Sequence, residues 1–370
     1  MLERIISERI QQEGPITFET FMDMALYLPE HGYYMAGESV IGPDGDFFTS
    51  PHLHPVFGWL LAIQTDEMRR FLGEPGGFTI LEIGAGSGFM SEGILSYIRR
   101  EFNWGDGWRY IIVERNPHIR QGQQKMLSEY KGIVQWVSSL TEVEQFCGCV
   151  VSNELPDSFP VHVVRMNDTF SEVYVDVAED GFKETEGELS TPDLAEYIRR
   201  YRIPEITGYR TEVNLRLRGF LEKIDNLLTE GFVITIDYGY PSWEYYAEER
   251  NRGTLLCYHR HTCNEDPYGY VGEQDITAHV NFSSLRDWGE EVGMRTIGYC
   301  PQGTFLVSLG IDKVISGMLS ADPGFQSEIP KIKGLLLGMG DTHKVMVQYK
   351  GKRESGGLMG FELRNRLNLL

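Results

Sequence analysis

Three carboxylates stand at or just after the ends of apolar segments that are typical of buried strands. Glu154 and Asp157 lie in SNELPD (152–157), and Asp237 lies in IDYG (236–239). The carboxyl ends of parallel strands share one edge of a sheet, where open α/β folds bind their ligands. Carboxylates at that edge could hold a guanidinium bidentately and take up its proton. The alternatives are turn formation for the SNELPD residues and a helix cap or loop anchor for Asp237.

A glycine turn, LEIGAGSGFM (81–90), follows an apolar run and precedes a predicted helix. Such a turn lets the backbone approach a nucleotide, and N–H groups at the helix start face it. A dinucleotide fingerprint requires Gly or Ala three residues after Gly86, where Phe89 stands. Glu82, inside the strand, disfavours the anionic pyrophosphate of NAD or FAD and favours a cationic sulfonium. These features predict S-adenosylmethionine as the cofactor.

Glu114 ends the next predicted strand, where a carboxylate can accept both ribose hydroxyls of a nucleoside. Its alternative role is to stabilise the start of the following helix. Asn153 could bind cofactor or substrate through its amide. The predicted cofactor contacts are Glu82, Gly84, Ala85, Gly86, Ser87, Gly88, Glu114, Arg115, Ser139, Leu140 and Asn153.

A third group of polar residues is predicted to contact the substrate or to form a lid. His279 suits proton transfer near neutral pH, although a purely structural histidine is the favoured alternative. The GDFFTSP segment (45–51) is predicted to close over the cofactor, with a surface turn as its alternative. The members of this group are Asp46, Thr49, Ser50, Tyr238, Asp275 and His279.

The segment CYHRHTC (257–263) places Cys257, His259, His261 and Cys263 at every second position. Structural zinc sites space their ligands differently. In an extended strand the four side chains would spread over about 20 Å, too far for one ion. We therefore expect no metal site.

The predicted elements follow the order of an α/β protein. Strands alternate with helices from residue 78 onward, which indicates βαβ units and a parallel sheet. Residues 31–55 form a long aromatic loop, and 172–196, with nine Asp or Glu and one Lys, form an acidic insertion. The predicted strands are 78–84, 110–114, 132–137, 147–153, 161–166, 172–178, 232–239, 296–300 and 344–350; the predicted helices are two within 1–28, then 87–101, 116–130, 211–230, 282–292 and 326–337.

The order of the predicted elements divides the chain into two predicted parts. Residues 1–75 form an N-terminal helical segment and lid loop, and residues 76–370 form the catalytic domain. Insertions into that domain are expected at about 161–230 and 240–295.

Composition and charge exclude several classes of partner. The net charge of −20 argues against nucleic acid, because such binding depends on a Lys/Arg footprint. No apolar run approaches the length that spans a membrane. Five cysteines without a secretory signal indicate a reducing compartment and a cytoplasmic protein. A homodimer is compatible with residues 31–55, which could be lid, interface or both.

The chain resembles the MidA-like (NDUFAF7-type) methyltransferase family over nearly its whole length. The motifs that carry the resemblance are ALYLPEHGYYM (25–35), IGPDGDFFTSP (41–51), LEIGAGSG (81–88), VERNP (113–117), SNELPDSFPVHVV (152–164), IDYG (236–239), GTLLCYHRH (253–261), GEQDITAHVNF (272–282) and QGTFLVSLG (302–310). Ala85 and Ser87 stand where the family often has Pro and Arg, and Pro156 also departs from its pattern.

The resemblance implies a Rossmann-like class I methyltransferase. We expect a seven-stranded, mostly parallel sheet with a helical N-terminal extension and β-rich or helical insertions. It implies S-adenosylmethionine as methyl donor and an arginine of a protein partner as acceptor. Two other functions stay open. One is methylation of a small molecule, which needs a closed apolar pocket; the other is an assembly chaperone that retains the cofactor site.

Overall fold

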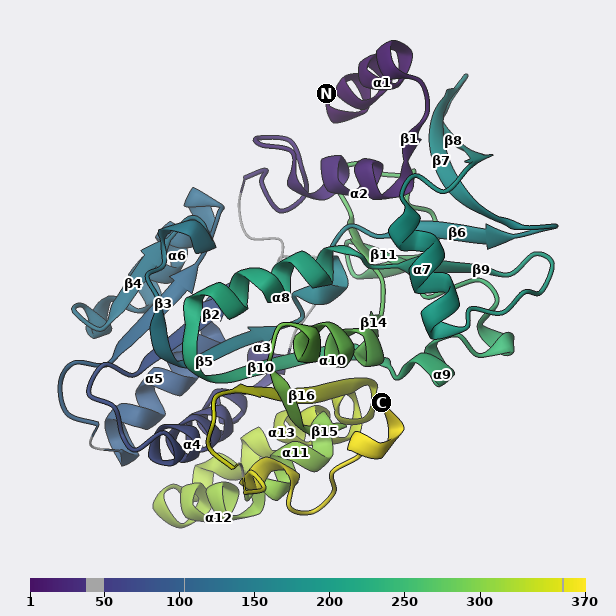
Figure 1. The fold of residues 1–370 in the computed structure, drawn as a ribbon. Helices are drawn as coiled ribbons and strands as arrows, with labels where there is room; N and C mark the ends of the chain where they lie inside the picture. The colour runs from purple at the N-terminus through teal and green to yellow at the C-terminus, as the bar shows by residue number, and fades with distance from the viewer. Residues whose placement is uncertain (38–49, 103, 355) are drawn as a thin grey trace. The chain divides into compact units, whose positions relative to one another are not determined.

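The computed structural model describes residues 1–37, 50–102, 104–354 and 356–370. The chain forms two compact units, each assembled from three segments of sequence. Unit 1 comprises Met1–Phe47, Pro156–Phe220 and Tyr240–Leu285; unit 2 comprises Phe48–Leu155, Leu221–Gly239 and Arg286–Leu370. Figure 1 labels the elements along the chain.

Unit 2 contains the sheet that the alternating pattern predicts. Its strands are β2 (Thr79–Ile83), β3 (Arg109–Val113), β4 (Val134–Val137), β5 (Phe146–Asn153), β10 (Leu228–Tyr240), β15 (Arg295–Pro301) and β16 (His343–Lys350). They follow the order β15-β16-β10-β5-β2-β3-β4, and the two-residue β14 (Val280–Asn281) pairs with β10 as an eighth strand. β16 is antiparallel to both β10 and β15, and the other pairs along the order are parallel.

The expected seven-stranded sheet is therefore not confirmed, because the sheet is mixed and has eight strands. A strand of two residues has no alternating pattern that a sequence could show. The helices of this part of the chain are α3 (Ser50–Leu53), α4 (Val56–Phe71), α5 (Phe89–Glu101), α6 (Pro117–Met126), α11 (Gln302–Ser308), α12 (Ile311–Ala321), α13 (Ile329–Leu337) and α14 (Met339–Thr342); α8 (Arg216–Leu227) and α10 (Phe282–Glu291) cross the unit boundary along the chain.

The core of unit 2 forms around its central strands. Buried residues run continuously over 148–153 of β5 and 231–237 of β10, as expected of strands covered on both faces. α4 and α5 approach so closely at Gly58 that a Cβ there would meet the Cα of Gly93 at 2.8 Å. Only glycine allows this contact, which holds α5 and the turn before it against the core.

Unit 1 contains two smaller sheets and the N-terminal helices. Its elements are α1 (Leu2–Glu13), β1 (Ile16–Thr17), α2 (Phe18–Tyr27), β6 (His162–Met166), β7 (Phe170–Ala178), β8 (Gly181–Gly187), α7 (Pro192–Tyr201), β9 (Arg210–Val213), α9 (Ser242–Tyr245), β11 (Leu256–His259), β12 (Thr262–Asn264) and β13 (Asp275–Thr277). The larger sheet has the order β1-β7-β6-β9 with β8 on β7, and the smaller has the order β12-β11-β13. Phe18 and Phe21 of α2 are buried in the core of this unit.

Two local predictions differ from the structure. The helix expected over 211–230 begins only at Arg216, because residues 210–213 form β9 and the Asn214 side chain accepts from the Leu217 N–H at 3.3 Å. The segment 257–263 is a hairpin of β11 and β12 rather than one extended strand, with His259 opposite Thr262. α11 and α12 were not predicted.

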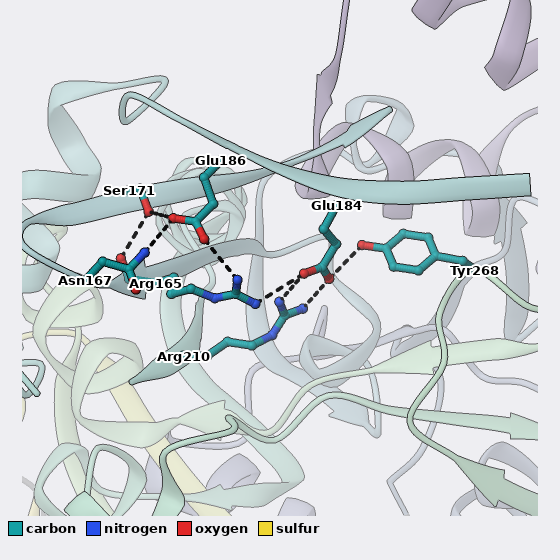
Figure 2. A network of polar contacts seen from close by, with 7 residues as sticks. All are labelled: Arg165, Asn167, Ser171, Glu184, Glu186, Arg210 and Tyr268. Atoms are coloured by element: carbon teal, nitrogen blue, oxygen red, sulfur yellow. Dashed lines mark hydrogen bonds and ion pairs between the residues drawn. The ribbon is translucent and has the colours of Figure 1, made fainter. Parts of the chain in front are cut away.

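The acidic insertion includes β8, whose carboxylates are neutralised within unit 1 (Figure 2). Arg165 on β6 lies directly opposite Arg210 on β9, a like-charge pair that is destabilising by itself. Arg210 donates to both oxygens of Glu184 at 2.6 and 2.8 Å, and Arg165 donates to Glu186 at 2.9 Å. Tyr268 adds a bond to Glu184 at 2.9 Å. The acidic side chains of β8 therefore hold the strands of the larger sheet together.

Candidate functional site

The glycine turn has a backbone that requires glycine at all three positions. Gly84, Gly86 and Gly88 have φ of 72°, 52° and 85°, in the left-handed region that other residues rarely adopt. The turn joins β2 to α5, with Gly88 at the N-cap position. Because that helix end leaves backbone N–H groups unpaired, the turn presents donors to a ligand.

Glu82 supports this turn from inside the protein. Its side chain is buried in β2, and its Oε2 accepts from Ser91 and Tyr110 at 2.5 Å each. Burial raises the pKa of Glu82 to about 7, against these two hydrogen bonds. The carboxyl group therefore joins β2 to α5 and β3, and its predicted contact with the cofactor stays a prediction.

Glu114 lies at the end of β3 and accepts hydrogen bonds from several neighbours. Its Oε1 accepts from the Asn116 N–H at 2.8 Å, and its Oε2 accepts from Gln123 at 3.3 Å. Burial raises its pKa, opposed by hydrogen bonds from Asn116, Gln123 and the Arg115 backbone and by the charge of Arg120. A carboxylate has about four acceptor positions, so these bonds leave capacity for a further donor such as a ribose hydroxyl. Asn116, not Glu114, caps α6.

Gln123 is a functional candidate that the sequence reasoning missed. It is fully buried, and its amide nitrogen donates to the carbonyl of Gly86 at 2.8 Å as well as to Glu114. Its amide oxygen accepts from the indole of Trp136 at 3.1 Å. One side chain thus fixes the glycine turn relative to Glu114. A polar residue on the inner face of the predicted helix 116–130 was the available signal.

Glu154 has an unusual backbone conformation for its type. Its φ is 50°, a strained value for a residue with a Cβ, and its N–H donates to the carbonyl of Ile236 at 2.8 Å. Oε1 accepts from Asn153 at 3.2 Å and lies 3.5 Å from His343 Nε2. The following residue, Leu155, lies against the turn, 3.1 Å from where a Cβ of Gly84 would be. Glu154 is therefore next to the predicted cofactor site.

Two histidines that were not predicted lie beside these residues. His343 begins β16, and because β16 is antiparallel to β10 its first residue meets the carboxyl end of that strand, opposite Tyr238. His52 on α3 lies 3.3 Å from the hydroxyl of Ser87. Burial lowers the pKa of His52, and the charge of Glu154 opposes that effect. The apolar strand predicted at 344–350 was the available signal for His343.

The remaining predicted residues of unit 2 lie at the same edge of the sheet or near the turn. Asp237 is fully buried in β10 and accepts from the Tyr238 N–H at 2.8 Å. Ser139 caps the short helix that starts at Leu140, and Arg115 is exposed. Ser50 is fully buried and its hydroxyl pairs with Gln302 at 3.2 Å, and its role as a lid contact stays a prediction.

Asp157, Asp275 and His279 belong to unit 1. The carbonyl of Asp157 accepts from the Ala278 N–H at 2.9 Å, and Asp275 accepts from Tyr34 at 2.7 Å. The N–H of His279 donates to Thr254 at 3.0 Å. Their roles in catalysis stay predictions. Asp46 and Thr49 lie outside the described residues.

Across the described ranges no group of three or more His, Cys, Asp or Glu could hold a metal ion. Within those ranges no single helix is long and apolar enough to cross a membrane. The two helices Gln302–Ser308 and Ile311–Ala321, which are bent by 60° relative to each other, reach that length and apolar composition only when taken together.

The glycine turn, Glu114 and the parallel strands define a nucleoside-binding α/β protein, and comparison with known families identifies its class. The profile of Methyltransf_28, described as an S-adenosyl-L-methionine-dependent methyltransferase family, matches residues 60–300. The chain belongs to this family. Its fit to such a cofactor is visible in the three left-handed glycines and in the unused acceptor positions of Glu114.

Individual relatives match nearly the whole length of the chain. A COG1565 superfamily member from Burkholderia thailandensis, solved with S-adenosyl-homocysteine, has a TM-score of 0.91 and 30% identity, covering 100% of this chain and 96% of that one. The Caenorhabditis elegans protein arginine methyltransferase NDUFAF7 homolog, mitochondrial, is 25% identical over 99% of this chain and 91% of its own length. The human NDUFAF7 protein is 25% identical over 96% and 84%.

The expected cytoplasmic location is wrong on these comparisons. The curated relatives from worm, fly, rat and human are all named as mitochondrial proteins. Reduced cysteines do not separate one reducing compartment from another, so the composition could not support that prediction.

Proposed function

We propose that this methyltransferase transfers its methyl group to an arginine of a protein partner and that Glu154 holds the guanidinium. The observation that carries the proposal is the position of Glu154, directly before Leu155, which contacts the glycine turn. Both side-chain contacts of Glu154 fall on Oε1, and Oε2 has no partner among the described residues. The relatives' names as protein arginine methyltransferases support this acceptor.

A guanidinium requires such a group because it stays protonated at neutral pH. Glu154 Oε2 would orient one guanidinium nitrogen and accept its proton as the new N–C bond forms. Asn153 Oδ1 is buried without a hydrogen-bond partner among the described residues, so it offers a second acceptor. Asp237, buried at the same sheet edge, is proposed to assist Glu154. A catalytic role for Asp157 stays a prediction. When bound, S-adenosylmethionine supplies the methyl group, and its sulfur keeps the electron pair of the broken bond.

The proposal is tested with tritium-labelled S-adenosylmethionine and a lysate of the source cells that lack this protein. The label should appear in protein, and hydrolysis should release it as methylarginine. Glu154→Gln should lower this transfer by about 100-fold or more while binding of S-adenosyl-homocysteine changes little. Glu179→Gln, at an exposed position of unit 1, is the matched control.

Other outcomes separate the alternatives. Label confined to small molecules would indicate a small-molecule methyltransferase, and no label at all would indicate a chaperone. Label on another amino acid, or full transfer by Glu154→Gln, would refute the proposed role of Glu154.

A further inference from the structure

His343 carries a buried nitrogen that no hydrogen bond satisfies. The residue is 6% exposed, and its Nε2 has no hydrogen-bond partner among the described residues. That atom faces Glu154 Oε1 at 3.5 Å, beyond ordinary hydrogen-bond length. A buried polar atom left in this way costs free energy, so its position calls for a functional reason.

The contacts of the other ring nitrogen are compatible with a neutral His343 that carries its proton on Nδ1. Nδ1 lies 3.1 Å from the hydroxyl of Thr342, and that hydroxyl donates to the carbonyl of Met339 at 3.3 Å. A threonine hydroxyl has one proton, so while it donates to Met339 it can only accept from His343. Nδ1 then carries the hydrogen, and Nε2 presents a lone pair to the carboxylate. Two lone pairs that face each other at 3.5 Å leave room for one proton between them.

The groups around His343 define its electrostatic setting. Tyr238 on β10 packs its ring at 5.4 Å from the imidazole, and Asp237 precedes it on the same strand. Lys344 on β16 donates to the carbonyls of Asp341 and Thr342 at the end of α14. On the described elements around it, Glu154 is the group whose side chain forms an ion-pair contact with the imidazole.

We propose that His343 takes from Glu154 the proton that methyl transfer releases, an inference that rests on the proposed arginine acceptor. As the guanidinium nitrogen bonds to the methyl carbon, the sulfur–carbon bond breaks and its electron pair stays on sulfur. One N–H proton passes to the Glu154 carboxylate and then to His343 Nε2, so the product guanidinium keeps its charge. The side chains of Glu154 and His343 are 9% and 7% exposed, so the proton stays on His343 during the transfer and passes to water when the product has left the site. His343 is a positioning residue that acts through Glu154 and restores it for the next turnover.

The first test needs no substrate and uses the full chain. In wild-type protein labelled with ¹⁵N-histidine, neutral His343 should carry its proton on Nδ1 and present an unprotonated Nε2. The His343 signals are assigned by their absence in His343→Gln. A neutral ring protonated on Nε2 would overturn the proposal.

The second test measures the pH dependence of methyl transfer to lysate protein. In the wild type the rate should fall in acid as Nε2 becomes occupied by a proton. His343→Gln should lose this acid limb and about tenfold in rate at pH 8, less than the loss of a direct acid–base residue. His31→Gln, a substitution in unit 1, should keep the wild-type profile. An unchanged profile in His343→Gln refutes the proton transfer, whereas absence of methylarginine from the wild-type reaction refutes the arginine acceptor and leaves the NMR result intact.

Discussion

Glu82 makes the stability of unit 2 depend on pH near neutrality. Its carboxyl group is 1% exposed, and two hydroxyls donate to one of its oxygens. Burial raises its pKa from 4.5 to about 7. Because the folded value is raised, the stabilisation is complete below pH 4.5 and is lost as pH rises through 7.

The magnitude follows from the width of this window. Each pH unit between 4.5 and 7 lowers the free energy of unfolding by up to about 1.4 kcal/mol, which gives about 3 kcal/mol in total. Glu82→Gln removes the titration. The difference in unfolding free energy between wild type and Glu82→Gln should therefore change by about 3 kcal/mol between pH 4.5 and 8, with the wild type losing stability as the pH rises.

Urea unfolding followed by tryptophan fluorescence at several pH values measures this difference. The slope against pH is the informative quantity, because the lower hydrogen-bonding quality of an amide shifts the whole curve by a constant. Glu179→Gln, at an exposed position, should run parallel to wild type. A wild-type minus Glu82→Gln difference that stays constant from pH 4.5 to 8 would refute the reasoning.

Two further outcomes are expected from the hydrogen-bond networks. Gln123→Met removes the hydrogen bonds to Gly86 and Glu114, each of which contributes about 1 kcal/mol. The Kd for S-adenosyl-homocysteine, measured by calorimetry, should therefore rise about tenfold or more. Gln135→Met, at an exposed position on β4, is the control, and equal affinities of Gln123→Met and wild type would contradict a positioning role for Gln123. Glu184→Gln should lower the thermal unfolding midpoint at neutral pH through a loss of about 1–3 kcal/mol. Burial raises the pKa of Glu184, but bonds from Arg210 and Tyr268 hold it below its ordinary value, so this stabilisation is present above pH 4.5 and is lost in acid. The two midpoints should therefore converge below pH 4.5, and a gap that stays constant there would argue against this ion pair.

Local sequence was sufficient for the seven longer strands of the unit 2 sheet and for the glycine turn. The apolar runs of β5 and β10 predicted buried strands because parallel strands are covered on both faces. The spacing of Gly84, Gly86 and Gly88 predicted a turn, and each adopts a φ that favours glycine. Residues 211–213 were misassigned to a helix because a strand of four residues, 210–213, shows too little periodicity.

Local sequence did not predict which residues each candidate side chain contacts in the folded protein. Ser50 looked like a lid contact in a polar segment, yet it is fully buried against Gln302 from a distant part of the chain. His343 was not predicted as a site residue, because its neighbours in sequence give no reason to place it beside Glu154. That contact arises only because β16 runs antiparallel to β10.

The sequence by itself determined the class of cofactor turn and the strands that carry it, since both depend on backbone preferences within a few residues. The tertiary structure decided which side chains meet at the sheet edge. Gln123 joins the turn to Glu114, and His343 faces Glu154, through contacts between segments far apart in the chain. Such contacts depend on sheet order and strand direction, which no local pattern of residues encodes.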